Sequence, residues 1–251
     1  MPQENENSHF CDHVIPVCCL GSDGGHGKPK LIGSAAVLKY HNQYYVVTAG
    51  HVLSEVNIND IRIGEINENL LDYQISYFQN DDVVDIGVIK ITEAISKRII
   101  QGPKKIIDLD NKSNYLSRFR LTKGWVATAG YPASRAKTWA GPNIMKLQSK
   151  TIKGTIREEI KDSTDTTFSF HYNRKKSRKE GIKQVVMGPK PAGMSGSPVW
   201  LDESQYPELM EFAGVVIEYC PRNKYIVATR AEVVLQCIQE IERHLQATQK
   251  G

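Results

Sequence analysis

Short apolar runs recur along the whole chain, and most of them are separated by turn-forming residues. Within the runs, β-branched and aromatic residues are frequent, which is typical of strands. The runs cover residues 31–38, 43–48, 61–64, 73–78, 83–91, 121–129, 166–171, 212–219 and 225–229. Residues 143–153 and 155–160 extend the pattern and predict a hairpin that turns at Gly154.

A helical period is found near the C-terminus. There, apolar residues recur at helical spacing, at Val234, Cys237, Ile238, Ile241 and Leu245. Thr229 and Glu232 precede them with the spacing of a capping box, in which the two side chains satisfy the first backbone N–H groups of a helix. The pattern therefore predicts an all-β fold with one C-terminal α-helix.

The composition excludes several classes of protein. The chain has 251 residues, of which 40% are hydrophobic and 24% charged, as in soluble globular proteins. No apolar run approaches the roughly 20 residues that span a bilayer, and the polar start lacks the features of a secretory signal. The formal net charge of +4 is too small to indicate nucleic-acid binding. We expect a cytoplasmic protein with no membrane contact and no nucleic-acid partner.

The cysteines indicate neither a disulfide framework nor a metal site. There are five of them, and their spacing is irregular. No paired CxxC motif is present, and the seven histidines have no ligand-like spacing to a cysteine pair. We expect reduced thiols, no metal and no cofactor.

Residues 193–198 read Gly-Met-Ser-Gly-Ser-Pro, which predicts a sharp turn that exposes the backbone around Ser195. A serine hydroxyl is a poor nucleophile until a neighbouring base removes its proton and an acid orients that base. The sequence offers one candidate for each task, His51 and Asp85.

Both candidates lie at the ends of apolar strands. A lone histidine is more often structural, but His51 follows a strand and stands beside Ala49 and Gly50, which leave space around its ring. Asp85 is flanked by apolar residues, and a partly buried carboxylate needs a partner. An imidazole is a suitable partner, so the two residues favour an acid–base pair.

Residues 173–179 form the one dense basic run of the sequence. Such a run is most often a solvated loop. A nucleic-acid contact needs a broader patch with aromatic platforms, and Tyr172 is the aromatic residue at hand. A third alternative is a regulatory or self-cleavage loop, because exposed loops of this kind are cut readily.

The motifs at 48–51, 85–91 and 193–198 together resemble those of the chymotrypsin/trypsin-like serine proteases, in which His, Asp and Ser occur in this order. Residues 214–219 resemble the strand that lies beside the substrate in that family. The resemblance spans roughly residues 30–245.

This resemblance implies two six-stranded antiparallel β-barrels with the site between them. The first, residues 1–110, would carry His51 and Asp85; the second, residues 111–251, would carry Ser195 and the C-terminal helix.

The same resemblance implies a role for each residue of the site. Ser195 would attack the peptide carbonyl, and His51 would act first as general base and then as general acid. Asp85 would orient the imidazole ring. The backbone N–H groups of Gly193 and Ser195 would form the oxyanion hole.

Two departures from the family change these expectations. Met194 stands where zymogens of the family have an aspartate, and no Ile-Val-Gly-Gly start is visible. The chain is in this respect similar to the bacterial high-temperature-requirement proteases and to intracellular trypsin-like domains. Pro189 stands where trypsin-like members have their specificity-setting aspartate, so a preference for Lys or Arg does not carry over by that route.

We expect the substrate pocket to be lined by residues near the serine and on the strand beside the substrate. The candidates are Pro189, Ile217, Glu218, Tyr219 and His171, with core packing as the stronger alternative for His171. A protease without a zymogen switch needs restraint, so we expect residues 188–193 or the basic run to be held inactive until a protein partner or an oligomer forms.

The sequence thus predicts an intracellular regulatory or processing serine endopeptidase that acts on polypeptides. The alternative is a protease-like binding module that holds a protein or RNA through residues 173–179.

Overall fold

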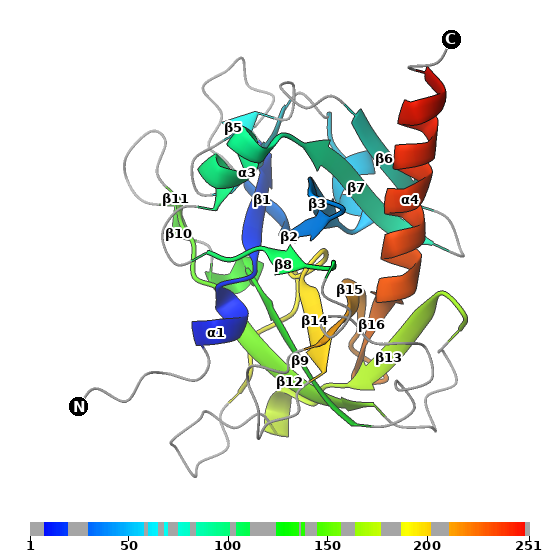
Figure 1. Ribbon diagram of the computed structural model, residues 1–251. Coiled ribbons are helices and arrows are strands. Elements are labelled where there is room, and N and C mark those ends of the chain that lie inside the picture. The colour runs from blue at the N-terminus through cyan, green and yellow to red at the C-terminus, as the bar shows by residue number, and fades with distance from the viewer. Residues whose placement is uncertain are drawn as a thin grey trace, which may run out of the picture.

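The computed structural model is built mainly from strands, and its longest helix lies at the C-terminus (Figure 1). The structure describes residues 8–19, 30–57, 60–64, 68–69, 75–80, 84–100, 104–110, 124–135, 137–138, 145–156, 164–176, 187–201 and 211–248.

The first half of the chain forms a half-barrel sheet of eight strands. Their order is β5-β4-β1-β2-β3-β7-β6, and β8 adds to β2 as a parallel neighbour. The bounds are β1 (Ile15–Cys19), β2 (Lys30–Tyr40), β3 (Gln43–Thr48), β4 (Ile61–Ile63), β5 (Glu68–Asn69), β6 (Ile75–Asn80), β7 (Asp85–Ile91) and β8 (Ile107–Asp108). Within the described residues no pairing joins β5 to β6, so this sheet stays open where a closed barrel was expected.

The second half forms a closed barrel of six strands in the order β12-β13-β16-β15-β14-β9. The bounds are β9 (Gly124–Gly130), β12 (Lys150–Ile156), β13 (Thr167–His171), β14 (Pro198–Leu201), β15 (Glu211–Cys220) and β16 (Tyr225–Arg230). Two short strands, β10 (Lys137–Thr138) and β11 (Met145–Lys146), pair with each other outside it. Buried aromatic residues, among them Phe168 and Phe170, fill the barrel.

In the described residues, four α-helices accompany the sheets: α1 (Ser8–Cys11), α2 (Gly50–Ser54), α3 (Glu93–Ile99) and α4 (Ala231–Thr248). The sequence pattern predicted α4 but not the three short ones. α3 begins where the hydroxyl of Thr92 accepts a hydrogen bond from the N–H of Ile95, at 3.2 Å. In the described part of the chain, no helix is long and apolar enough to cross a bilayer.

Helix α4 joins the two halves, because it packs against β15 and β16 of the barrel and also against β7 of the first sheet. The Tyr45 hydroxyl donates to Glu242 Oε1 at 2.6 Å, and Lys90 Nζ donates to the same oxygen at 2.7 Å. The polar side of the helix is thereby fixed to strands that come some 150 to 200 positions earlier.

The expected architecture of two β units followed by a helix is confirmed, but two local predictions are wrong. No hairpin turns at Gly154, because β12 runs straight through it. A Cβ atom there would lie 2.6 Å from Cδ2 of Phe170, so the glycine serves a close approach and not a turn. Thr229 does not directly precede α4, because the helix begins at Ala231 and Arg230 stands between them; the Thr229 hydroxyl donates instead to the carbonyl oxygen of Asp85 at 3.3 Å.

Candidate functional site

Strand pairing in the first sheet brings His51 and Asp85 together. Thr48 of β3 pairs with Gly87 of the antiparallel strand β7. The residues after Thr48 and before Gly87 therefore leave this ladder at the same end. Asp85 is the first residue of β7, and His51 lies in the single turn of α2. A Cβ atom at Gly87 would lie 2.6 Å from Cδ1 of Leu53, so the glycine gives α2 room to pack on β7.

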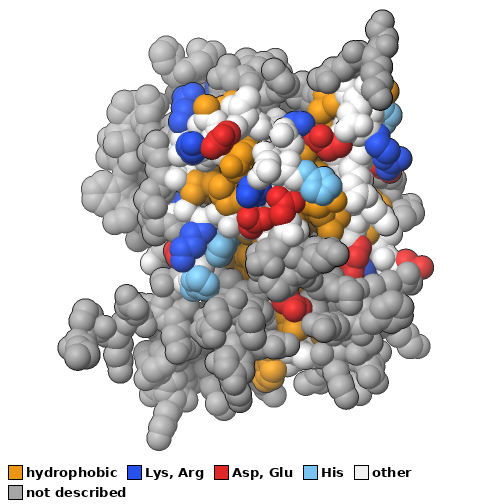
Figure 2. All heavy atoms as spheres, in the orientation of Figure 1, with side chains coloured by type: hydrophobic (Ala, Val, Ile, Leu, Met, Phe, Trp, Pro, Cys, Tyr) orange, Lys and Arg blue, Asp and Glu red, His pale blue; other side chains and the backbone are white. Residues whose placement is uncertain are grey.

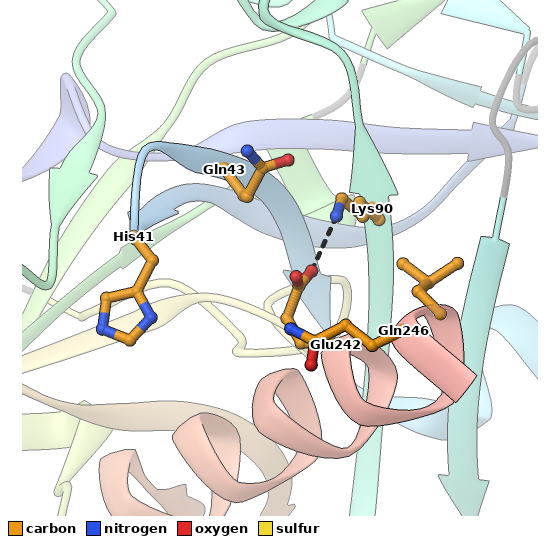
Figure 3. A pocket seen from close by; sticks show the side chains of 6 residues that line it. His41, Gln43, Lys90, Glu242 and Gln246 are labelled. Carbon is orange, nitrogen blue, oxygen red and sulfur yellow. Dashed lines mark hydrogen bonds and ion pairs between the residues drawn. The ribbon is translucent and has the colours of Figure 1, made fainter. Parts of the chain in front are cut away.

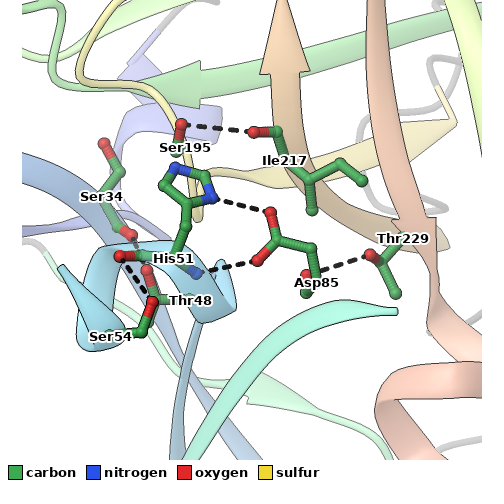
Figure 4. A network of polar contacts seen from close by, with 8 residues as sticks. All are labelled: Ser34, Thr48, His51, Ser54, Asp85, Ser195, Ile217 and Thr229. Carbon is green, nitrogen blue, oxygen red and sulfur yellow. Dashed lines mark hydrogen bonds and ion pairs between the residues drawn. The ribbon is translucent and has the colours of Figure 1, made fainter. Parts of the chain in front are cut away.

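His51 and Asp85 make two hydrogen bonds (Figure 4). The distance from His51 Nδ1 to Asp85 Oδ2 is 2.7 Å, and the backbone N–H of His51 donates to Oδ1 at 2.9 Å. The side chains are 26% and 16% exposed, so water competes little for these bonds. With Nδ1–H donating to the carboxylate, Nε2 carries no proton and can accept one.

The charge around His51 favours its protonated form. The hydrogen bond to the Asp85 carboxylate raises the pKa of His51 above its ordinary value of 6.5, and burial of the ring opposes this rise. The negative charges of Asp85, Glu55 and Glu218 raise the pKa further. The ring is therefore a stronger base than an isolated imidazole.

Ser195 comes from the second half of the molecule and lies beside the His51 ring, on the side away from Asp85 (Figure 4). Its hydroxyl donates to the carbonyl oxygen of Ile217 at 3.4 Å. No hydrogen bond from this hydroxyl to the His51 ring is present among the described residues. Such contacts are often long in the absence of substrate and tighten when it binds.

Residues 191–194 form a turn that orients the peptide before Ser195. The N–H of Met194 donates to the carbonyl oxygen of Pro191 at 2.8 Å, and Gly193 has a φ of 87°, as the third position of a type II turn requires. The carbonyl of Ala192 accepts the N–H of Ala133 at 2.7 Å. Because C=O and N–H point in opposite directions across a trans peptide, the Gly193 N–H points away from Ala133.

Three hydroxyl residues at the site were missed by sequence reasoning: Ser34, Thr48 and Thr229. Ser34 and Thr48 are linked by a hydrogen bond from Thr48 Oγ1 to the Ser34 carbonyl oxygen, at 2.7 Å. All three are completely or almost completely buried. The sequence did contain a signal for them, because a small polar residue inside an apolar strand run is buried and its hydroxyl then needs a hydrogen-bond partner.

The pocket candidates are divided by the structure. Tyr219 packs edge-on against Tyr172, whose hydroxyl donates to the carbonyl oxygen of Pro189 at 3.0 Å. Glu218, which precedes Tyr219 on β15, is exposed. His171 is separated from this group, because side chains alternate along β13 and Phe170 and Tyr172 occupy the barrel side.

The basic run is described in part. Arg174 is tied to the loop that precedes the serine, since its Nε donates to Gly188 O at 2.7 Å and its carbonyl oxygen accepts the Gly188 N–H at 2.8 Å. Residues 177–179 lie outside the described residues. On the face seen in Figure 2, coloured side chains of both signs are interspersed rather than gathered into one basic patch.

A hollow of about 400 Å³ lies between the first sheet and α4 (Figure 3). Lys90 and Glu242 form an ion pair of 2.7 Å in its wall. Because the two charges neutralise each other, neither Lys90 nor Glu242 offers a net charge to a ligand in this hollow. The candidate site is therefore the group of residues around Ser195.

Among the described residues, the cysteines offer neither a disulfide nor a metal site. None of the five cysteines forms a disulfide. Burial raises the pKa of Cys18 to about 11 and that of Cys237 to about 12, which disfavours their reactive thiolates. Within the described ranges, no three His, Cys, Asp or Glu side chains gather as metal ligands.

No protein-family model matches the chain, and no curated protein matches it. Its fold is that of the chymotrypsin-like serine proteases. The serine protease domain of the Sesbania mosaic virus polyprotein has a TM-score of 0.50 and 12% identity, over 89% of this chain and 90% of that one. A Glu endopeptidase has a TM-score of 0.52 and 11% identity, over 96% and 94% of the two chains.

The inactivated protease paralogue S-D1 of the scabies mite has a TM-score of 0.52 and 12% identity, over 94% of each chain. The fold expected from the motifs is thereby confirmed. Since an inactivated protein shares it, the fold alone does not show activity.

Proposed function

We propose that this chain is a serine endopeptidase that cleaves peptide bonds through an acyl-enzyme. The observation that carries the proposal is the alignment of Asp85, His51 and Ser195, in which the carboxylate holds Nδ1 at 2.7 Å and the hydroxyl lies at the opposite side of the ring. Serine needs this arrangement of base and orienting acid to act as a nucleophile.

The first half of the proposed reaction forms the acyl-enzyme. Ser195 Oγ attacks the scissile carbonyl carbon while His51 Nε2 takes the hydroxyl proton. The carbonyl oxygen becomes an oxyanion held by the N–H groups of Gly193 and Ser195. When the tetrahedral intermediate collapses, His51 gives the proton to the leaving amine, and the C–N bond breaks.

The second half restores the enzyme. Water attacks the acyl carbon and loses a proton to His51, and the bond to Ser195 Oγ breaks as His51 returns the proton to it. Asp85 remains ionised and stabilises the imidazolium in both halves.

Strand β15 supports a polypeptide as the substrate. Among the described residues, β15 pairs with β14 up to Val215, whereas Glu218 to Cys220 pair with β16 alone. The other edge of this segment begins beside Ser195, whose hydroxyl bonds to Ile217 O. An extended peptide can add to such an edge through main-chain hydrogen bonds.

We further propose that the residue before the scissile bond is apolar. The Tyr172 hydroxyl donates to the carbonyl oxygen of Pro189, and Tyr172 belongs to a buried apolar cluster that also contains Val216 and Ile226. Pro189 stands where trypsin-like members have their specificity-setting aspartate, so a Lys or Arg would find no counter-ion at that position.

Control and location remain predictions. We propose that a partner or oligomer regulates access to Ser195 through the loop at 188–193, which is tied to Arg174 and Tyr172. A cytoplasmic location is proposed with the five cysteines, none of which forms a disulfide, as its support.

The test is cleavage of an unbiased peptide library by the wild type and by Ser195→Ala. The wild type should release products with apolar residues before the cut, and Ser195→Ala should release none. Ser96→Ala is the matched control, because Ser96 is equally a serine, is fully buried, and its hydroxyl donates to the carbonyl oxygen of Glu93 in the same helix, α3. Equal cleavage by wild type and Ser195→Ala overturns the proposal and leaves the binding module as the alternative.

A further inference from the structure

Ser34 is a fully buried polar residue in the middle of β2, and no role has been assigned to it so far. Its side chain makes two hydrogen bonds. The hydroxyl donates to the carbonyl oxygen of Gly193 at 3.0 Å and accepts the backbone N–H of Tyr131 at 3.0 Å. One serine of the first sheet therefore holds two separate segments of the second half.

The backbone of Ser34 binds the same loop. Its N–H donates to the carbonyl oxygen of Ser195 at 2.8 Å, and its own carbonyl accepts the Thr48 hydroxyl at 2.7 Å. Thus the carbonyls of Gly193 and Ser195, the two residues proposed to supply the oxyanion hole, are both held by Ser34.

These bonds fix the orientation of the proposed donors. Gly193 lies between two peptide groups: Ala133 holds the one before it through Ala192 O, and Ser34 holds the one after it through Gly193 O. Tyr131, which Ser34 also binds, is only two residues before Ala133. The hydroxyl of Ser34 therefore connects the two restraints that set the direction of the Gly193 N–H.

The approach of β2 to the loop depends on glycine on both sides. A Cβ atom at Gly33 would lie 3.1 Å from Ser195 O, and one at Gly196 would overlap the carbonyl oxygen of Ser34. The φ of Gly196 is 89°, which other residues rarely adopt. Because Ser34 is fully buried, bulk water does not reach the position of its hydroxyl, so Ser34→Ala leaves the carbonyl of Gly193 and the N–H of Tyr131 without this partner.

We propose that Ser34 is a positioning residue that holds the oxyanion-hole N–H groups in their working direction. The inference rests on the proposed function for its catalytic consequence, but its structural part concerns the order of the loop alone. Ser34 touches neither substrate nor the reacting atoms; it acts through Gly193 and Ser195.

The test compares Ser34→Ala with Ser96→Ala, which removes an equally buried hydroxyl far from the loop. In Ser34→Ala we expect kcat to fall about 10- to 100-fold with KM unchanged. Misdirected N–H donors stabilise the transition state less but leave the binding of the substrate ground state unchanged. Affinity for a peptide boronate should fall by the same factor, while that for a cleaved product peptide should not change. Ser96→Ala should match the wild type.

A second readout is independent of catalysis. Amide hydrogen exchange at Ala133 and Gly196, whose N–H groups donate to Ala192 O and Val216 O, should be about 10-fold faster or more in Ser34→Ala and unchanged in Ser96→Ala. If Ser34→Ala does not fold, Thr48→Val takes its place, since it removes only the hydroxyl that supports the Ser34 carbonyl.

The outcomes separate the two proposals. Unchanged kcat and unchanged exchange in Ser34→Ala overturn the role of Ser34, even if the wild type is an active protease. Faster exchange in a protein whose wild type cleaves nothing supports Ser34 as the residue that orders the loop and overturns the proposed function instead.

Discussion

The two halves of the candidate site are held in different ways. His51 and Asp85 are placed by a regular antiparallel ladder, which pairs Thr48 with Gly87 and brings the next residues to one end. Ser195 sits in an irregular loop, whose direction depends on bonds from elsewhere, such as those of Ser34. The base is thus fixed by secondary structure and the nucleophile by tertiary contacts. Damage to the loop should therefore leave the base intact.

The largest expected effect on kcat comes from removing the carboxylate that orients His51. Asp85→Asn should lower kcat by about 10,000-fold, because an amide favours the tautomer whose proton sits on Nε2, where it faces Ser195. Steady-state kinetics checks this. Asp110→Asn is a matched control, since Asp110 also accepts a histidine backbone N–H, that of His41 at 2.6 Å. Equal losses in both variants would contradict the assignment.

Displacing the loop that carries Ser195 should have the next largest effect on kcat. In Gly196→Ala the new methyl group would overlap the Ser34 carbonyl and the Thr48 hydroxyl, and the loop must shift. We expect kcat to fall by about 100-fold or more. The low-field NMR signal of the His51 Nδ1 proton should persist, because its bond to Asp85 lies in the other half. Loss of that signal would show that the two halves are not independent.

Removing the attachment of α4 should affect stability and not chemistry. Glu242→Ala leaves the buried Tyr45 hydroxyl without its acceptor, and unfolding free energy should fall by about 1–3 kcal/mol. Denaturant unfolding measures this. Glu240→Ala, which removes an exposed carboxylate from the same helix, should change it by less than about 1 kcal/mol. A large loss of kcat in Glu242→Ala would mean that the helix also shapes the site.

The smallest effect concerns pH. Activity needs neutral His51, and its raised pKa places the acid limb of kcat/KM above the ordinary histidine value. Glu218→Gln removes one of the negative charges that raise it, so the limb should move to lower pH, less so at high salt. Glu240→Gln is the control. A limb that moves upward would contradict the electrostatic account.

The same pKa has a consequence for stability. Because it is higher in the folded protein, protonation of His51 favours folding. This contribution is complete below the unfolded histidine pKa of about 6.5 and is lost as the pH rises through the raised folded value. Unfolding free energies measured across this window should show the loss in the wild type but not in His51→Ala.

The strands and the three candidate residues could be predicted because each depends on local pattern. One apolar run ended just before His51, another began near Asp85, and glycines flank the Met194–Ser195 pair. The failures came from contacts distant in sequence. Gly154 was interpreted as a turn because its neighbour Phe170 is 16 positions away, and Thr229 as a cap because its partner is in the first sheet.

The central claim is that Ser195 is a nucleophile activated by His51, and covalent labelling by a fluorophosphonate tests it most directly. Mass spectrometry of the digested protein should find the adduct on Ser195 alone, and His51→Ala should label far more slowly. An unlabelled wild type across the pH range, or an adduct on another serine, would contradict the claim.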